Sequence, residues 1–204
     1  MMDSVTMKFA QHVRSQADNN EFEINVSNAN FKVHESYNSN FDVCIVDAGQ
    51  SIFDAATAAG ADSSKVAAAC LPTAEAVHGS ACWVAGWGHE ASGGSMADTL
   101  KSVGVNIMSA EYCTANSHPD NPFRGDDEFC AGQPDCDGNN KTDPGSDSCQ
   151  NDSGGPLVCA VDGKAVITGI VSRGAGCAFE GYPGIYGEVF DYLSWINQNS
   201  VVSG

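Results

Sequence analysis

Seven short runs of the chain carry alternating or β-branched apolar residues between stretches rich in turn-forming residues. The runs are Glu21–Val26, Phe41–Val46, Ala81–Trp87, Leu100–Ile107, Pro156–Val161, Ala165–Ser172 and Gly184–Val189. Runs of this length, bounded by Gly, Pro, Asn and Asp, are typical of strands in antiparallel sheets. The pattern therefore predicts an all-β fold.

The C-terminal end has a helical period instead. Phe190, Leu193 and Ile196, with Trp195 beside them, form an apolar stripe, so we expect a helix over Phe190–Asn197 that packs on a barrel.

The Ala/Ser-rich stretch Ala55–Ala69 is ambiguous, because alanine favours a helix whereas its position between two β-rich parts suits a linker. We interpret it as part of a connection over residues 55–80, between a first β unit at 1–54 and a second at 81–204.

Length and cysteine content suggest a disulfide-bonded globular protein. The chain has 204 residues, of which 42% are apolar, enough to bury a core. It has no apolar run of membrane-spanning length, and its first residues lack the pattern of a secretory signal. Nine cysteines without metal-type spacing favour disulfides and an oxidising compartment, with at least one thiol left unpaired within the chain. We therefore expect a secreted protein whose natural N-terminus lies upstream.

The charge balance is strongly acidic. Twenty-six acidic and nine basic residues give a formal net charge of −17. This charge argues against nucleic acid and against an anionic membrane surface as partners, and it would attract a cationic substrate. Most of these acids are expected on a solvated surface.

A polar loop at 133–148 has the outline of a calcium-binding loop but fails its requirements. The sixth position is Asn140 rather than glycine, and Ser146 stands where a bidentate glutamate belongs. We predict a surface insertion and no metal site.

Among the sequons at Asn25, Asn140 and Asn151, only that of Asn140 lies in an obviously exposed loop.

The candidate chemistry lies in Cys149-Gln150-Asn151-Asp152-Ser153-Gly154-Gly155-Pro156. This stretch places Ser153 between a carboxylate and two glycines. The glycines allow a substrate to approach the backbone closely, and a tight turn can direct amide N–H groups at an oxyanion. Ser153 is thus a candidate nucleophile, and an ordinary turn serine is the alternative.

Four spaced motifs in this order resemble the trypsin-like (chymotrypsin-fold) serine proteases, in an N-terminally truncated form. Besides the serine stretch they are Ala81–Gly88 with its Gly-Trp-Gly, the pair Ser172–Cys177 and Pro183–Tyr186, and Phe190–Asn199. The resemblance implies two antiparallel β-barrels, the first one incomplete here, followed by a C-terminal helix.

The resemblance also implies roles for single residues. Ser153 would attack the scissile carbonyl, and Asp42, in Phe41-Asp42-Val43, would orient the catalytic histidine. A strand-start aspartate is the alternative for Asp42. Backbone N–H groups of Asn151 and Ser153 would bind the oxyanion, and Asp152 resembles the aspartate that pairs with the N-terminal ammonium released on activation.

Asp147 matches the charged base of the specificity pocket in trypsin-type members, with Gly174 and Gly184 leaving room for a long side chain. The implied activity is cleavage of protein or peptide substrates after Arg or Lys, with protease inhibitors as possible partners, no cofactor, and a monomeric state. A solvated acid in an acidic loop is the alternative for Asp147. Asn151 replaces the family's usual glycine, and Arg173 replaces its usual tryptophan.

The disulfides implied by the resemblance are Cys82 with Cys159, Cys113 with Cys130, and Cys149 with Cys177. Cys44, Cys70 and Cys136 remain. Cys70 resembles the cysteine that many relatives bond to a segment upstream of the mature protease.

The family's Ala-Ala-His-Cys motif, which supplies the catalytic histidine, does not precede Asp42. We expect all five histidines, His12, His34, His78, His89 and His118, to be loop or surface residues, because a general base must lie within hydrogen-bond reach of the serine. The chain as given is therefore expected to be inactive. The parent protein is either a trypsin-like endopeptidase or a non-catalytic homologue that binds or regulates a partner.

Overall fold

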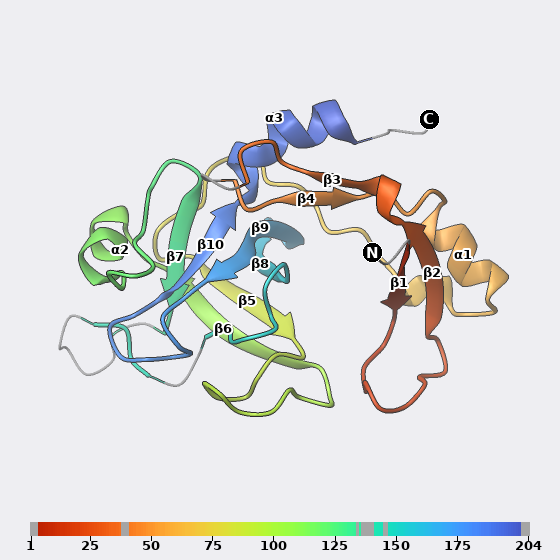
Figure 1. The fold of residues 1–204 in the computed structure, drawn as a ribbon, viewed down its shortest axis with the longest axis horizontal. Coiled ribbons are helices and arrows are strands. Elements are labelled where there is room, and N and C mark those ends of the chain that lie inside the picture. The colour runs from red at the N-terminus through yellow and green to blue at the C-terminus, as the bar shows by residue number, and fades with distance from the viewer. Residues whose placement is uncertain (1–3, 38–40, 134, 136–140, 145–146, 201–204) are drawn as a thin grey trace.

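A closed antiparallel barrel forms the larger part of the protein (Figure 1). The computed structural model describes residues 4–37, 41–133, 135, 141–144 and 147–200. Six strands close the barrel in the order β10-β7-β6-β5-β8-β9. Their bounds are β5 Ala81–Gly86, β6 Lys101–Ile107, β7 Glu128–Gly132, β8 Pro156–Val161, β9 Lys164–Arg173 and β10 Gly184–Glu188.

Alternation along the strands builds the barrel core. In β5 the side chains of Cys82 and Val84 are buried, whereas Trp83 between them is 50% exposed. Cys82 also lies opposite Cys159 of β8 in the register, and a disulfide joins the two. The pleat thus directs every second residue inward, where these side chains pack with Leu157 and Tyr186.

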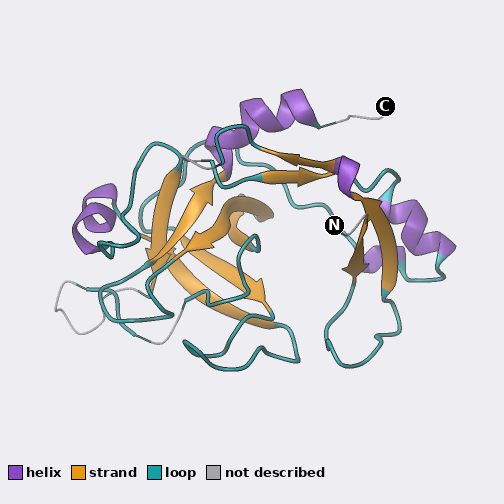
Figure 2. Ribbon diagram, in the orientation of Figure 1, coloured by secondary structure: helices purple, strands orange, loops and turns teal. Residues whose placement is uncertain are grey.

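Four strands precede the barrel and form two separate two-stranded sheets. Strand β1 (Ser4–Phe9) pairs with β2 (Phe22–Ser27), and β3 (Phe31–Val33) pairs with β4 (Cys44–Val46), with the 3-10 helix Asn28–Asn30 between β2 and β3. Figure 2 shows the β3–β4 sheet between the β1–β2 sheet and the barrel. A second apolar cluster, which includes Phe22, Ile24 and Val26, covers one face of β2.

Helix α1 (Ile52–Ala58) packs on this second cluster, and the 3-10 helix Ser63–Lys65 follows it. Ser51 caps α1 by accepting a hydrogen bond from the Asp54 N–H, and Ala56 is fully buried against Phe22 and Ile24. The start of the segment interpreted as a linker is therefore helical, as its alanine content favoured.

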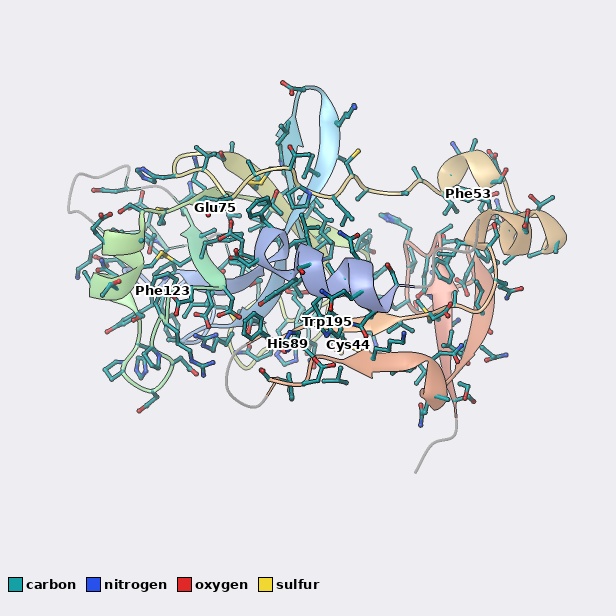
Figure 3. All side chains as sticks on the ribbon, turned by 90° about the horizontal axis from the view of Figure 1, so that it is seen from above. Cys44, Phe53, Glu75, His89, Phe123 and Trp195 are labelled. Carbon is teal, nitrogen blue, oxygen red and sulfur yellow. A yellow bond between two sulfur atoms is a disulfide. The ribbon has the colours of Figure 1, made fainter. Side chains whose placement is uncertain are left out.

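Two further helices accompany the barrel. Helix α2 (Ala110–Asn116) is tied to β7 by the Cys113–Cys130 disulfide, and α3 (Val189–Asn199) contacts β9. The expected C-terminal helix is confirmed, but its most buried side chains are Val189 and Tyr192 rather than the proposed stripe. Viewed from above in Figure 3, Phe53 of α1 and Phe123 lie at opposite ends of the molecule.

Each of the seven expected β runs contains a strand, although Phe41–Val46 is a strand only over Cys44–Val46. The elements that the pattern does not indicate are β1, β3, β7 and α2, whereas α1 overlaps the start of the ambiguous Ala/Ser-rich stretch. The expected insertion at 133–148 is described only in part, and Cys136, Asn140 and Ser146 lie outside the described residues. Within the described part of the chain, no helix has the length and apolar character needed to cross a bilayer.

Candidate functional site

Ser153 lies on a tight turn that leads into β8. The turn is closed by hydrogen bonds from the Asp152 N–H to the Cys149 carbonyl (3.0 Å) and from the Gly155 N–H to the Asp152 carbonyl (2.8 Å). Gly154 has a φ of +81°, and a Cβ on Gly155 would lie 2.7 Å from the Asp152 carbonyl oxygen. Both glycines are therefore required by the turn, and they leave Ser153 exposed.

A cavity of about 160 Å³ joins the candidate nucleophile to the candidate specificity residue. Its lining includes Ser153 and Asp147 together with Ser172, Gly174 and Gly184. We call this cavity the Asp147 slot. A Cβ on Gly184 would lie 2.6 Å from Asp147 Oδ1, so glycine at this position keeps the slot open.

Protein groups surround the Asp147 carboxylate. Oδ1 accepts a hydrogen bond from the Ser148 N–H (2.8 Å), and Oδ2 accepts one from the Ala178 N–H (3.2 Å). Burial raises the pKa of Asp147 to about 6 from its usual value near 3.8, although these two N–H groups work in the opposite direction. At neutral pH the slot therefore holds a poorly solvated negative charge.

Three disulfides hold the described part of the barrel, and they are the pairs that the resemblance implied: Cys82–Cys159, Cys113–Cys130 and Cys149–Cys177. The last one connects the turn before Ser153 to the segment after Gly174, which is the opposite wall of the slot. Cys44 and Cys70 are exposed free thiols.

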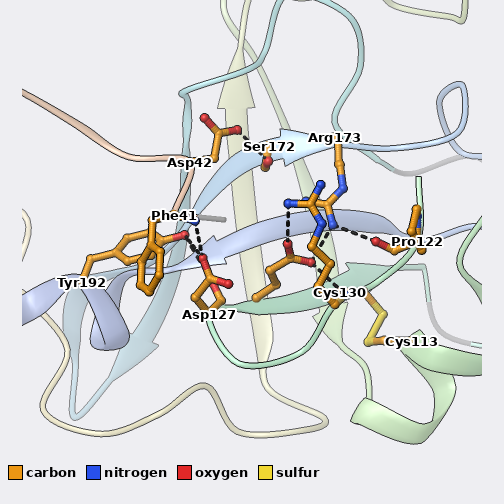
Figure 4. Close-up of polar contacts among 11 residues, drawn as sticks. Phe41, Asp42, Cys113, Pro122, Asp127, Cys130, Ser172, Arg173 and Tyr192 are labelled. Carbon is orange, nitrogen blue, oxygen red and sulfur yellow. Dashed lines mark hydrogen bonds and ion pairs between the residues drawn. A yellow bond between two sulfur atoms is a disulfide. The ribbon is translucent and has the colours of Figure 1, made fainter. Parts of the chain in front are cut away.

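Asp42 reaches this site through Ser172. Its Oδ2 accepts a hydrogen bond of 2.7 Å from Ser172 Oγ, and Ser172 lines the Asp147 slot (Figure 4). The preceding Phe41 has a φ of +52°, and its N–H donates to Asp127 Oδ2 at 2.7 Å. Tyr192 of α3 also donates to this carboxylate, so a buried group fixes the turn that delivers Asp42.

A second cavity of about 260 Å³ lies beside the first and shares Ser172 and Arg173 with it. Arg173 Nη2 is 2.7 Å from Glu128 Oε2 and 2.8 Å from the Pro122 carbonyl oxygen. The Glu128 side chain is only 4% exposed. Arg173, which stands where the trypsin-like proteases of the resemblance usually have tryptophan, thus belongs to a buried ion pair.

The Asp152 side chain points away from Ser153 toward the loop after β5. Its Oδ1 accepts from the Gly88 N–H (2.8 Å) and its Oδ2 from the Cys149 N–H (2.9 Å). A Cβ on Gly88 would lie 2.4 Å from Asp152 Cγ. The glycines of the Gly-Trp-Gly motif therefore make room for this carboxylate.

Asn151 adopts a φ of +73°, a conformation natural to the glycine it replaces. Its side-chain Nδ2 lies 3.0 Å from His89 Nε2. The sequence predicts a loop or surface histidine at position 89 and carries no signal for this pair, because the two residues are 62 positions apart.

In the described residues, neither His89 nor any other histidine lines the Asp147 slot. The His34 ring stacks on Phe41, with ring centroids 4.4 Å apart, and contacts Trp195 of α3. No histidine forms a hydrogen bond with Ser153 or Asp42 in the described residues.

Comparisons with known proteins agree over most of the chain. A family model described as "Trypsin" matches residues 2–196. "Trypsin-1" from Astacus astacus is 42% identical over 118 residues, which are 58% of this chain and 46% of that protein. "Tissue-type plasminogen activator" from Rattus norvegicus is 39% identical over 141 residues, which are 68% of this chain and 24% of that protein. "Trypsin beta" from Drosophila erecta is 33% identical over 181 residues, which are 87% of this chain and 63% of that protein. The chain thus spans less than two thirds of the length of each of these relatives.

Proposed function

Because the chain belongs to the trypsin family of serine proteases, we propose that it carries the nucleophile and the specificity slot of an endopeptidase that cleaves after Arg or Lys. The observation that supports this most is the shared cavity of Ser153 and Asp147. A cationic side chain in the slot would bring the adjoining peptide carbonyl to the serine.

The slot would select for charge. A guanidinium or ammonium group in it would form a charge-assisted pair with Asp147, whereas a neutral side chain would leave the carboxylate desolvated and without a partner. The net charge of −17 would also steer cationic substrates toward the protein. Protein inhibitors that present Arg or Lys would use the same slot.

The chemistry would be acyl transfer at Ser153. Its Oγ would attack the carbonyl carbon and form an ester while the amine leaves with a proton, and water would then hydrolyse the ester. Backbone N–H groups of Asn151 and Ser153 would bind the oxyanion, and Asp42, held by Ser172, would orient a histidine.

This reaction requires a general base within hydrogen-bond reach of Ser153. None of the five histidines has such a contact in the described residues, so we propose that this chain by itself binds substrate without turning it over. Asp152, bound to backbone amides beside an open cavity of about 280 Å³, would receive the ammonium formed on activation.

We further propose that β1–β4 belong to the first of the family's two barrels. The three disulfides favour an extracellular or secretory compartment, where such bonds persist.

Binding of benzamidine, a small planar amidinium, tests the slot without requiring catalysis. We expect saturable binding by calorimetry, and about a 100-fold loss of affinity in Asp147→Asn, because a charge-assisted pair is lost. Asp162→Asn makes the same charge change on the β8–β9 turn and should leave the affinity unchanged. The proposal fails if wild type does not bind or if Asp147→Asn binds equally well.

A non-catalytic, partner-binding homologue is the second candidate. The Asn151 side chain, the Arg173–Glu128 pair and the absence of a histidine at Ser153 in the described residues favour it. A serine-reactive fluorophosphonate probe, applied to full-length activated protein, distinguishes the two. Stoichiometric labelling of Ser153 eliminates this candidate, whereas benzamidine binding without labelling supports it.

A further inference from the structure

Three consecutive residues around the turn before Ser153 are bound by two consecutive residues of the loop after β5. The His89 N–H donates to the Gln150 carbonyl (2.9 Å), His89 Nε2 lies 3.0 Å from Asn151 Nδ2, and the Gly88 N–H donates to Asp152 Oδ1 (2.8 Å). This contact is a continuous brace rather than a single hydrogen bond.

The brace fixes one particular peptide plane. The Gln150 carbonyl and the Asn151 N–H belong to the same trans peptide unit, so they point in opposite directions. Because the carbonyl points at the His89 backbone, the Asn151 N–H must point away from the loop that carries His89. The backbone N–H of position 89 thus determines where this donor is aimed, and the His89 side chain acts only through its contact with Asn151.

The Asn151 side chain provides a second contact between Asn151 and His89, in addition to the backbone bond at Gln150. A positive φ costs a non-glycine residue conformational energy, least for Asn and Asp, and a local hydrogen bond can offset the cost. The Asn151 carboxamide bonds instead to the His89 ring, 62 positions away in the chain, and this bond holds the side chain at the turn. In the neutral ring the Nε2 lone pair accepts the Nδ2–H, which places the ring proton on Nδ1.

The bond to Asn151 determines how the ring is oriented. His89 Nδ1 is buried and has no hydrogen-bond partner in the described part of the structure. The charged groups of the adjoining cavity are otherwise engaged: Glu90 pairs with Lys101 (3.2 Å), and Asp152 binds backbone amides. Asp147, the remaining charged group, binds the Ser148 and Ala178 amides.

We propose that His89 is a positioning residue for the oxyanion-binding turn, holding the Asn151 peptide in the orientation that a glycine adopts freely. This inference rests on the proposed function, in which the Asn151 N–H binds the oxyanion. The combination His89 with Asn151 would then replace the usual glycine without loss of the donor.

Nuclear magnetic resonance of the isotope-labelled chain tests the brace. In wild type we expect an unprotonated Nε2 on His89, slowed exchange of the Asn151 side-chain amide protons, and backbone couplings that report a positive φ at Asn151. His89→Leu should accelerate that exchange about fivefold, the equivalent of one hydrogen bond of about 1 kcal/mol, and shift the couplings. His89→Gln, whose carbonyl can accept the same N–H, should restore the wild-type values.

A matched control is His78→Leu, which makes the same change at an exposed histidine before β5 and should alter nothing at Asn151. The proposal is overturned if His89→Leu leaves the exchange and the couplings of Asn151 as they are in wild type, or if Gln and Leu at position 89 behave alike. Benzamidine titrations of the same samples separate the two ideas. If wild type binds benzamidine and His89→Leu leaves the turn unaffected, only the brace is rejected. If His89→Leu loosens the turn but wild type does not bind benzamidine, only the proposed protease slot is rejected.

Discussion

At the scale of single residues, the proposed function depends on the charge of the Asp147 carboxylate, which lines the slot beside Ser153. Burial raises its pKa to about 6, so the group exchanges its proton in a pH range where most surface carboxylates are already charged. Two backbone N–H groups stabilise the charged form but do not compensate for the lost solvation. A bound cation would supply the missing compensation.

Benzamidine affinity should therefore depend on pH near 6. Protonation of Asp147 removes the charge that would bind the amidinium, so we expect binding at pH 5 to be about tenfold weaker than at pH 8. Calorimetric titrations across this range measure the effect. Asp147→Asn should give weak binding with a flat pH profile, and a flat profile in wild type would contradict the pKa assignment.

The same raised pKa predicts a cost in stability. The folded protein holds this proton more tightly than the unfolded chain, so the contribution of Asp147 to stability is fully present below pH 4 and is lost as the pH rises through 6. Asp147→Asn should thus raise the melting temperature at pH 7 relative to wild type, and the gain should vanish near pH 3. A destabilised variant at pH 7 would show that the amide bonds of the carboxylate outweigh its desolvation.

Among the elements, β7 and β9 are joined across the intervening β10 by the Arg173–Glu128 pair. Arg173 is the last residue of β9 and Glu128 the first of β7, and Glu128 is almost fully buried. A buried pair of this kind stabilises little relative to an apolar pair. Removing Arg173 takes away the closest cation of Glu128 and leaves this buried carboxylate with the longer contacts to Arg124, from its Nη1 (3.9 Å) and its N–H (3.3 Å).

Arg173→Leu should therefore cost about 3 kcal/mol of unfolding free energy, and the double variant Arg173→Leu with Glu128→Leu should recover most of it. Urea unfolding measures both. Lys101→Leu, which breaks the exposed pair with Glu90, should cost less than about 0.5 kcal/mol. Additive losses in the double variant would show that the pair is not coupled.

Elements with a regular period could be predicted from the sequence, and short buried ones could not. In strand β5, buried and exposed residues alternate, and the strand was expected. Strand β7 is buried along its whole length and begins at Glu128, a residue type that is usually exposed. Helix α2 has seven residues and depends on the Ser109 cap and on Cys113, so its apolar stripe is too short to detect.

In the candidate site, too, some residues could be predicted from the sequence and others could not. Ser153 and its glycines are adjacent in sequence, and the order of the motifs led to Asp147 and Asp42. The His89–Asn151 contact joins two loops, and the Arg173–Glu128 pair joins the ends of two strands; these segments meet only in the folded chain, across 62 and 45 positions. No local pattern encodes such a contact.

At the scale of the whole molecule, the described residues form three apolar clusters, and the two larger ones are cores of unequal strength. The barrel core includes Cys82, Leu157 and Tyr186, and all three disulfides of the described residues lie between Cys82 and Cys177. The other core, around Phe22, Ile24 and Ala56, supports only two-stranded sheets and α1. Two-stranded sheets are marginal in water, and cross-links restrict only the unfolded barrel.

Few polar contacts hold β1 and β2 to the barrel side. Asp98 provides several of them: its carbonyl accepts from the Arg14 N–H (2.7 Å), and its carboxylate accepts from the Ser15 N–H (2.9 Å) and hydroxyl (2.7 Å). The His12 carbonyl accepts from the Leu100 N–H (2.8 Å). This junction is the main polar link between the β1–β2 loop and the start of β6.

We therefore expect the two cores to open independently. Amide hydrogen exchange should be at least about 100-fold faster in β1, β2 and α1 than in β5, β8 and β9, because local opening of the weaker core exposes those amides without unfolding the barrel. Asp98→Ala should accelerate exchange in β1 and β2 further and leave β8 and β9 unchanged, whereas Asp162→Ala, on the β8–β9 turn, should not affect the first core. Equal protection in both parts, or an effect of Asp98→Ala on all strands, would mean that the chain unfolds as one cooperative unit and that the Asp147 slot depends on the strands before it.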